Sequence, residues 1–188
     1  MNHAFWKASA VFDGGRSLGG LAPDLDLHCA RAVASARAIR LKPPLTGPEI
    51  HEICVEAIAR FPPDAELYVR PMFYAAEGSV VPDPDSTRFT LAAYEAPLPR
   101  QGFSACLSSK RRPARDMAPT DAKAICLYPN SYLAIMEAQD RGFDNAVVLD
   151  CNGNVAEFTN ANLWIGKDGV AMTPAINGTF LNGITRQR

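Results

Sequence analysis

The spacing of apolar residues changes partway along this chain, and that change limits the folds open to it. In residues 24–39, and again after Thr46, apolar side chains recur at steps of three and four, the spacing of amphipathic helices. Thr46 and Glu49 have the spacing of a capping box, which predicts the start of the second helix. Residues 65–76 and 88–96 are instead rich in β-forming residues and flank a loop of Pro, Asp, Gly and Ser, so we expect two paired strands.

The segment APLPRQG (96–102) separates these elements from the rest of the chain. It contains two prolines and a glycine and has no periodicity, which is typical of a linker. Strand-like residues resume at 103–109. We therefore expect an α+β chain with two lobes, residues 1–95 and 103–188, joined by the linker 96–102.

One helix and two hairpins are expected in the second lobe. Pro129 should interrupt any helix that runs through it, so the regular helix is predicted to run from near Asn130 to Gly142. The Asn-Gly pair within residues 151–153 favours a hairpin with a type I′ turn, whose two central residues both have positive φ. A second hairpin is expected around residues 167–169.

Charge and hydropathy exclude two classes of partner. The chain has 19 basic and 20 acidic side chains and a formal net charge of -1, which gives no electrostatic basis for binding nucleic acid or an anionic membrane surface. No apolar run reaches the roughly 18 residues of a membrane span, and the N-terminus lacks the apolar stretch of a signal peptide. We therefore expect a cytoplasmic protein.

Metal and hydrolase chemistry find no support in the residues. The chain lacks the glycine-rich phosphate motifs, the HExxH zinc motif and the GxSxG serine motif, and its three histidines lack metal-ligand spacing, so we expect no metal site. His28 and His51 lie within helical patterns and are interpreted as ordinary helix residues. The five cysteines are scattered without a CxxC pair, so we expect reduced, small core residues at Cys29, Cys54, Cys106, Cys126 and Cys151.

Six short motifs carry a more specific signal because they occur together in one order. They are His3-Ala4 with Val11-Phe12-Asp13-Gly14, His28 to Ala36, Tyr68-Val69-Arg70-Pro71, Asp121-Ala122-Lys123-Ala124 with Tyr128, Val155-Ala156-Glu157 with Ala161-Asn162-Leu163, and Gly183-Ile184-Thr185-Arg186. Together they resemble the motifs of class IV (fold type IV) aminotransferases that depend on pyridoxal 5′-phosphate (PLP). The Tyr-x-Arg-Pro element favours the branched-chain amino acid aminotransferase branch.

The resemblance implies a fold and a catalytic lysine. The fold would be that of D-amino-acid aminotransferase, with a small α/β N-terminal lobe and a hairpin-rich, pseudo-barrel C-terminal lobe that binds the cofactor and is incomplete here. Lys123 would be the catalytic residue that carries the cofactor as a Schiff base, which requires partial deprotonation in a desolvated site. Without the resemblance, a lysine beside alanines such as Lys123 would be interpreted as a solvated helix residue.

Further contacts to the cofactor follow from the same resemblance. Arg31 matches the arginine that holds the phosphate, a suitable task for a planar guanidinium with paired donors. Glu157 matches the carboxylate that keeps the pyridine nitrogen protonated, and is otherwise an exposed strand glutamate. Tyr128 matches the tyrosine that hydrogen-bonds the ring oxygen, and the amides of Ile184 and Thr185 would donate to the phosphate at a helix start.

The resemblance also implies substrate contacts, made by two residues of one strand and by one apolar residue. Arg70 and Tyr68 match residues that recognise the amino-acid carboxylate, and their alternation with Val69 places both on one strand face. Phe12 would form an apolar wall for an aliphatic side chain. The alternative for Arg70 is a surface arginine beside a proline.

The implied activity is transamination of branched-chain L-amino acids, with 2-oxoglutarate as the usual acceptor, ping-pong kinetics and a homodimer whose active site lies near the interface. Alternatives are a D-amino-acid aminotransferase, an (R)-amine transaminase, aminodeoxychorismate lyase, or a non-catalytic remnant.

The chain departs from the family pattern at three places. Lys7 stands where the family usually has a tyrosine, so the substrate range is altered or the position is variable. Residues 158–160, which follow Glu157, are larger than is usual in branched-chain enzymes. The chain also starts late and stops at Arg188 relative to the family, so we expect a gene fragment or partial record that binds PLP poorly and has little activity by itself.

Overall fold

The computed structural model describes residues 2–188, and these divide into two compact units. The first unit contains the chain up to Arg100 together with the short segment Ala122–Cys126, and the second contains Gln101–Asp121 and Leu127–Arg188. The chain therefore leaves the first unit, returns to it for five residues and leaves again. The sequence-based boundaries had placed this returning segment in the second lobe, because its partners lie far away in the sequence.

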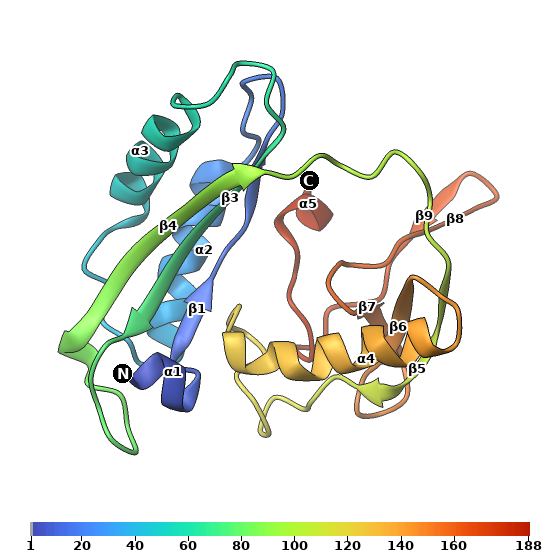
Figure 1. The fold of residues 1–188 in the computed structure, drawn as a ribbon. Helices are drawn as coiled ribbons and strands as arrows, with labels where there is room; N and C mark the ends of the chain where they lie inside the picture. The colour runs from blue at the N-terminus through green and yellow to red at the C-terminus, as the bar shows by residue number, and fades with distance from the viewer. Residues whose placement is uncertain (1) are drawn as a thin grey trace. The chain divides into compact units, whose positions relative to one another are not determined.

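The first unit is a sheet with helices packed on one face (Figure 1). Its elements in chain order are α1 His3–Lys7, β1 Ala10–Phe12, β2 Gly15–Ser17, α2 Leu25–Ala38, α3 Gly47–Ile58, β3 Leu67–Ala75, the 3₁₀ turn η1 Pro84–Ser86 and β4 Thr87–Glu95. Both predicted helices are confirmed, and α3 has the predicted capping box between Thr46 and Glu49. The predicted strand pair is also confirmed, because β3 and β4 are antiparallel along their whole length, from Leu67 opposite Glu95 to Ala75 opposite Thr87.

Strands β1 and β2 pair with β3 in one continuous register, with Phe12 opposite Met72 and Gly15 opposite Val69. The pairing is interrupted at Asp13 and Gly14, where the facing residue Pro71 has no N–H to donate. The Asp13 N–H still donates to the Pro71 carbonyl at 3.0 Å. The interruption frees Asp13 and Gly14 from the regular ladder in the middle of the sheet edge.

Alternate residues of β3 point to opposite faces of the sheet. Leu67, Val69, Pro71, Phe73 and Ala75 are buried, and all but Pro71 belong to the hydrophobic core that they form with α2 and α3. Burial of one large side chain such as Phe73 stabilises the fold by roughly 1.5–3 kcal/mol. The half-buried residues between them, Tyr68 and Arg70 included, therefore lie on the face away from the helices.

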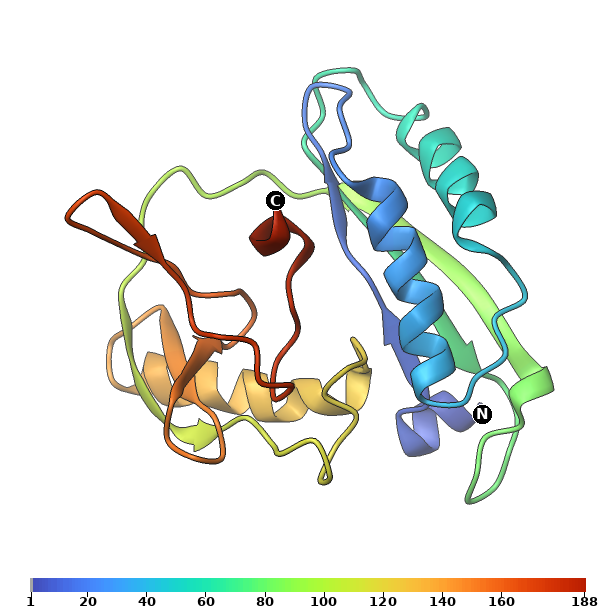
Figure 2. The same ribbon diagram turned by 180° about the vertical axis from the view of Figure 1, so that it is seen from behind.

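The second unit contains β5 Ala105–Arg111, α4 Tyr128–Asp140, β6 Asn145–Leu149, β7 Val155–Phe158, β8 Ile165–Lys167, β9 Val170–Met172 and α5 Ile184–Gln187. The 3₁₀ turn η2 Ile125–Leu127 connects the returning segment of the first unit to α4 in the sequence. Figure 2 shows the same elements from behind. Strands β5 and β6 are parallel neighbours, and α4, which connects them, packs on both. Strand β7 pairs antiparallel with β6, and β8 with β9.

Helix α4 begins earlier than the sequence pattern predicted. It starts at Tyr128 rather than near Asn130, with Pro129 in its first turn. A proline there is harmless because the first N–H groups of a helix have no partner within it, and its fixed φ suits the helix. The helix ends at Asp140, and Gly142 follows with φ of 82°, the left-handed conformation that favours glycine.

The two predicted hairpins form, but the turn expected at residues 151–153 does not. At residues 151–153 the type I′ prediction is wrong, because Gly153 has φ of 90° whereas Asn152 does not have a positive φ. The buried Asp150 side chain instead accepts hydrogen bonds from the N–H groups of Asn152 (2.9 Å) and Asn154 (2.8 Å), which fixes a longer loop. In the β8–β9 hairpin, Asp168 and Gly169 both have positive φ, at 52° and 75°.

The cysteines are all free, but they are not all core residues. Cys29 and Cys54 are buried, whereas Cys126 and Cys151 are exposed, so that part of the prediction is wrong. No helix in residues 2–188 is long and apolar enough to cross a membrane. Within the same residues, no group of three or more metal-binding side chains comes together.

Candidate functional site

The nine residues singled out by resemblance fall into two sets, one in each unit. Phe12, Arg31, Tyr68, Arg70 and Lys123 belong to the first unit. The second unit contains Tyr128, Glu157, Ile184 and Thr185.

Lys123 is held by its main chain against the first unit. Its N–H donates to the Ser35 hydroxyl on α2 at 3.0 Å, and its carbonyl accepts from the Phe12 N–H at 3.1 Å. Ala124 forms an antiparallel bridge with Val11, so the segment extends the sheet at the edge formed by β1. Lys123 precedes both η2 and α4, as predicted, and its backbone is anchored on both sides.

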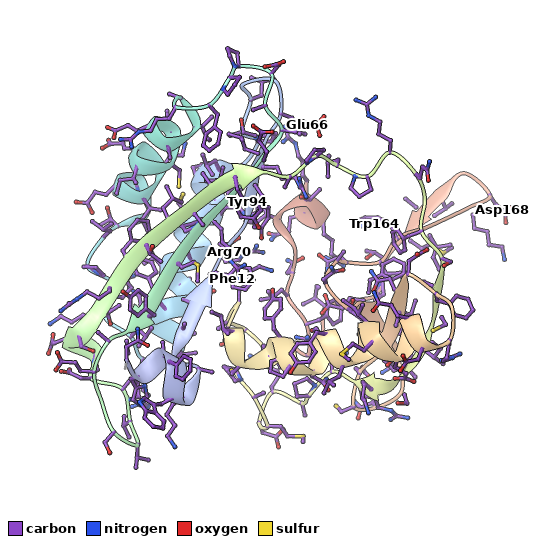
Figure 3. The ribbon with its side chains drawn as sticks, in the orientation of Figure 1. Phe12, Glu66, Arg70, Tyr94, Trp164 and Asp168 are labelled. Carbon is purple, nitrogen blue, oxygen red and sulfur yellow. The ribbon has the colours of Figure 1, made fainter. Side chains whose placement is uncertain are left out.

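Two of the predicted residues, Arg70 and Lys123, lie close to the aromatic ring of a third, Phe12. The Arg70 guanidinium carbon lies 3.8 Å from the centre of the Phe12 ring, and the Lys123 ammonium nitrogen lies 5.0 Å from the same centre. Figure 3 shows Phe12 and Arg70 close together on neighbouring strands. Both distances are within the range of cation–π attraction. One aromatic ring thus contacts two cationic groups.

Arg70 carries an unsatisfied donor. Its Nε is buried and has no hydrogen-bond partner in residues 2–188. A buried N–H without a partner costs about 1–3 kcal/mol, so such a group is a candidate for binding an anion.

Tyr68 is fixed between two neighbours on the same sheet. Its ring lies 5.7 Å from that of Tyr94 at an interplanar angle of 56°, and the Arg16 guanidinium carbon lies 5.7 Å from its centre. Its hydroxyl lies over Gly14, where a Cβ would come within 2.0 Å of that oxygen. A glycine at position 14 therefore makes room for the tyrosine.

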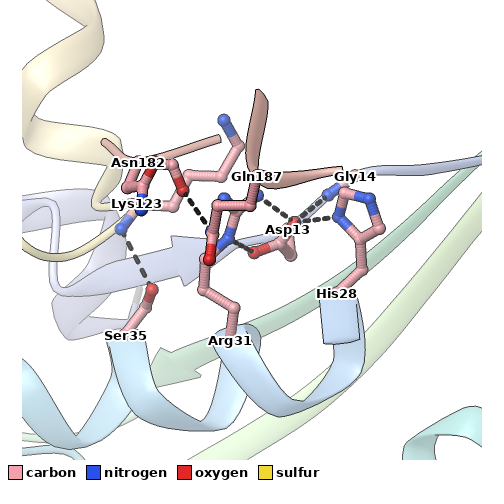
Figure 4. Close-up of polar contacts among 8 residues, drawn as sticks. All are labelled: Asp13, Gly14, His28, Arg31, Ser35, Lys123, Asn182 and Gln187. Atoms are coloured by element: carbon pink, nitrogen blue, oxygen red, sulfur yellow. Dashed lines mark hydrogen bonds and ion pairs between the residues drawn. The ribbon is translucent and has the colours of Figure 1, made fainter. Parts of the chain in front are cut away.

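Arg31 lies on α2 and is bound to a buried aspartate (Figure 4). Its Nε donates to Asp13 Oδ2 at 2.6 Å and its Nη2 to Oδ1 at 2.8 Å, while His28 Nδ1 lies 2.7 Å from Oδ1. Burial raises the pKa of Asp13, but the hydrogen bonds from Arg31 and His28 outweigh it and lower the pKa to about 2. Because an ionised carboxylate only accepts hydrogen bonds, the proton between His28 and Asp13 belongs to Nδ1.

Glu157, in the second unit, is a buried carboxylate on β7. Arg112 Nε lies 3.4 Å from its Oε1, and the Asn162 amide donates to its Oε2 at 3.3 Å. Arg112 is itself buried and donates to the Thr179 carbonyl at 3.0 Å. The exposed strand glutamate considered from the sequence is thereby excluded, because the carboxylate is enclosed and paired.

The other three predicted residues lie at helix starts. Tyr128 is the first residue of α4 and is half-buried, and Ile184 and Thr185 are the first two residues of α5, the former buried and the latter exposed. The preceding Gly183 is closely packed, because a Cβ there would lie 2.0 Å from the Asn162 amide oxygen. The phosphate contact of the two α5 amides stays a prediction.

Sequence reasoning missed three side chains that orient the predicted ones: Asp13, His28 and Arg112. Asp13 was inside a quoted motif, and His28 precedes Arg31 by three residues on one helix face, so both signals were available. Arg112 lies in a basic segment without periodicity, and nothing local indicated its partner. A surface hollow between α2 and α3 and another beside β2 are lined by none of the predicted residues.

Comparison with known proteins gives one consistent result. The family model for class IV aminotransferases matches residues 10–188. The probable branched-chain-amino-acid aminotransferase of Rickettsia bellii is 33% identical over 194 residues, covering 100% of this chain and 65% of that protein. The branched-chain-amino-acid aminotransferase of Escherichia coli K12 is 32% identical over 199 residues, covering 99% and 64%.

Comparison with solved structures points to the same family. A crystal structure of an aminotransferase from Brucella abortus bound to the cofactor PLP has a TM-score of 0.96 and 45% identity, over 99% of this chain and 68% of that one. The E. coli branched-chain enzyme has a TM-score of 0.91 and 32% identity, over 100% and 66%. The predicted fold class is confirmed, and the chain spans about 65% of the length of the curated relatives it matches. This chain belongs to the class IV aminotransferase family.

Proposed function

We propose that this chain takes part in PLP-dependent transamination of branched-chain L-amino acids, with 2-oxoglutarate as acceptor and ping-pong kinetics. The observation that carries the proposal is the placement of Lys123, whose main chain is fixed on both sides and whose amine lies 5.0 Å from the centre of the same Phe12 ring that Arg70 contacts. The names of the relatives from R. bellii and E. coli support the branched-chain assignment. A cytoplasmic homodimer is part of the same proposal.

The side chains present fit the needs of PLP. The cofactor requires an amine for its aldehyde, a planar cation for its phosphate and a carboxylate for its ring nitrogen, and Lys123, Arg31 and Glu157 have those chemistries. Glu157 is enclosed and paired with Arg112 and Asn162, so its position is fixed. The buried Arg70 Nε has a donor to offer to an anion.

When bound, PLP supplies an electron sink for the electrons left at the substrate Cα after its proton is removed. The Lys123 amine takes that proton and returns it, which requires the amine to be neutral at that moment. Glu157 holds a proton at the pyridine nitrogen. Arg70 binds the substrate carboxylate, and the Phe12 ring excludes water beside an aliphatic side chain.

The test is covalent trapping. The 188-residue chain is incubated with excess PLP, reduced with borohydride and digested, and the modified peptide is identified by mass spectrometry. Excess PLP offsets the weak binding expected of this chain by itself, so we expect modification of Lys123, with weaker labelling of the four exposed lysines at positions 7, 42, 110 and 167 as an internal control. Equal labelling of all five lysines would contradict the proposal.

Substrate class needs a separate experiment. Single-turnover reactions with L-valine, D-alanine, an (R)-amine and aminodeoxychorismate distinguish the branched-chain reaction from the other activities of this family. We expect L-valine to be the preferred donor, with slow conversion because this chain by itself is expected to have little activity. Conversion with D-alanine or the (R)-amine alone would reassign the substrate and leave the cofactor assignment intact, and trapping without any conversion would favour a non-catalytic remnant.

A further inference from the structure

A buried carboxylate connects the sheet to helix α2 in the first unit. Asp13 is fully buried, at 0% exposure, and lies where the pairing between the sheet edge and β3 is interrupted. Its Oδ1 accepts from the Gly14 N–H at 2.8 Å, from Arg31 Nη2 at 2.8 Å and from His28 Nδ1, and its Oδ2 accepts from Arg31 Nε. His28 and Arg31 are three residues apart on one face of α2, so both reach the same carboxylate.

The geometry of the Asp13–Arg31 pair determines which N–H groups of Arg31 are left to bind a ligand. A guanidinium has five N–H groups in a plane, and Asp13 takes the side that carries Nε and one N–H of Nη2. The two N–H groups of Nη1 and the second of Nη2 point along another edge of the same plane. That edge has the fork shape that binds two oxygens of a phosphate.

Because Asp13 already holds the Arg31 side chain in one conformation, less side-chain conformational entropy is lost when Arg31 binds a ligand. A free arginine side chain has about 2 kcal/mol of rotamer entropy, part of which is lost when it grips a ligand. Arg31 is already held at two points by a carboxylate that is itself held by a backbone amide and an imidazole. The opposing effect is electrostatic, since the aspartate charge reduces the attraction between Arg31 and an anion.

We propose that Asp13 and His28 are positioning residues that orient Arg31 towards the cofactor phosphate. The proposal rests on the proposed function, in which Arg31 binds that phosphate. His28 fixes the carboxylate by donating from Nδ1, and Asp13 turns the free edge of the guanidinium to the ligand. Neither residue touches the cofactor in this arrangement.

The test compares two ligands that differ only in the phosphate. Pyridoxamine 5′-phosphate and pyridoxamine are titrated into the 188-residue chain, and each dissociation constant is measured by calorimetry or by quenching of tryptophan fluorescence. Neither ligand forms a bond with Lys123, so the measurement reports binding alone. A change for the phosphorylated ligand only is a signature that a general structural defect does not produce.

We expect Asp13→Asn to weaken pyridoxamine 5′-phosphate about tenfold and to leave pyridoxamine unchanged. His28→Leu should weaken the phosphorylated ligand severalfold, and His28→Asn, whose amide can replace Nδ1 as donor, should restore most of the affinity. Asp26→Asn, an exposed aspartate on the same helix, is the matched control and should change neither constant. The histidine variants keep the proposal testable if Asp13→Asn does not fold.

Two different failures can be told apart. If Arg31→Gln weakens the phosphorylated ligand whereas Asp13→Asn and His28→Leu leave it unchanged or tighten it, positioning is wrong and the assignment of Arg31 stands. If the unmodified chain binds both ligands equally, or Arg31→Gln has no effect, the phosphate assignment within the proposed function is wrong and the positioning proposal fails with it.

Discussion

Arg70 lies above the Phe12 ring, with its guanidinium carbon 3.8 Å from the ring centre and its buried Nε without a hydrogen-bond partner in residues 2–188. The aromatic contact is worth about 0.5–2 kcal/mol, whereas the unsatisfied N–H costs about 1–3 kcal/mol. The two effects nearly cancel, so the fold gains little from this arginine. That balance is expected of a residue kept for binding an anion.

Arg70→Met should therefore change the unfolding free energy by less than about 1 kcal/mol, because it removes a favourable contact and an unsatisfied donor together. It should also weaken binding of a substrate carboxylate by one to two orders of magnitude, the size of a lost charged hydrogen bond. Urea unfolding and titration with L-valine measure the two quantities. Arg88→Met, on the exposed face of β4, is the control that should affect neither. Strong destabilisation by Arg70→Met would show that the arginine is structural.

Acid should weaken the fold through Asp13. The pKa of this carboxyl is lowered from 3.8 to about 2 in the folded chain, so its contribution to stability is present above pH 4 and is lost as the pH falls through 2. The difference of nearly two pKa units corresponds to about 2 kcal/mol. In Asp13→Asn, the loss of unfolding free energy between pH 4.5 and pH 2 should be smaller by about this amount than in the unmodified chain. Asp26→Asn should keep the full pH dependence, and an unchanged slope in Asp13→Asn would contradict the assignment.

Gly14→Ala should displace Tyr68. The new Cβ would lie 2.0 Å from the Tyr68 hydroxyl and 2.5 Å from the adjacent ring carbon, so the ring must move. We expect a loss of up to about 3 kcal/mol, measured by thermal unfolding, because overpacking costs roughly 1–3 kcal/mol in a tightly packed core and Tyr68 is half-buried. Shortening the clashing side chain in the double variant Gly14→Ala/Tyr68→Leu should remove most of the added cost of the alanine, measured against Tyr68→Leu alone. Gly102→Ala, where nothing lies within 4 Å of a Cβ, is the neutral control.

Arg112→Met should be strongly destabilising in the second unit. It removes the cation 3.4 Å from the Glu157 carboxylate, whose side chain is only 11% exposed, and breaking one side of a buried pair costs about 3–5 kcal/mol. Adding Glu157→Gln removes the uncompensated charge and should recover a large part of the loss. The exposed neighbour serves as control, since Arg111→Met should cost less than about 1 kcal/mol. A small effect of Arg112→Met would mean that water or another group compensates Glu157.

The sequence predicted those features that are encoded within a few residues. The capping box of α3 and the alternation that sends Tyr68 and Arg70 to one face both depend on local spacing, and both form as expected. The start of α4 was predicted too late because a proline interrupts a helix interior but is well accommodated in a first turn. The sequence pattern alone did not show in which of these two places Pro129 lies.

The sequence predicted residues for the candidate site but not the contacts that hold them in place. Lys123 was found by resemblance, yet its attachments to Ser35 and Phe12 join parts of the chain far apart in sequence, and no local pattern encodes them. The pairing of Arg112 with Glu157 has the same character. Each connection exists only after the strands and helices have packed, so reading short windows of sequence cannot reveal it.

The return of residues 122–126 to the first unit has a consequence for synthesis of the protein. The edge of β1 is completed by Ala124, so a ribosome must release most of this chain before that edge acquires its partner. Until then the nascent first unit presents the main-chain N–H and C=O groups of β1 to solvent, the kind of surface that recruits other unfolded chains. The amine at position 123 thus reaches its place in the same event that closes this edge, and a stalled translation product ending before residue 122 would lack that amine and be prone to aggregate.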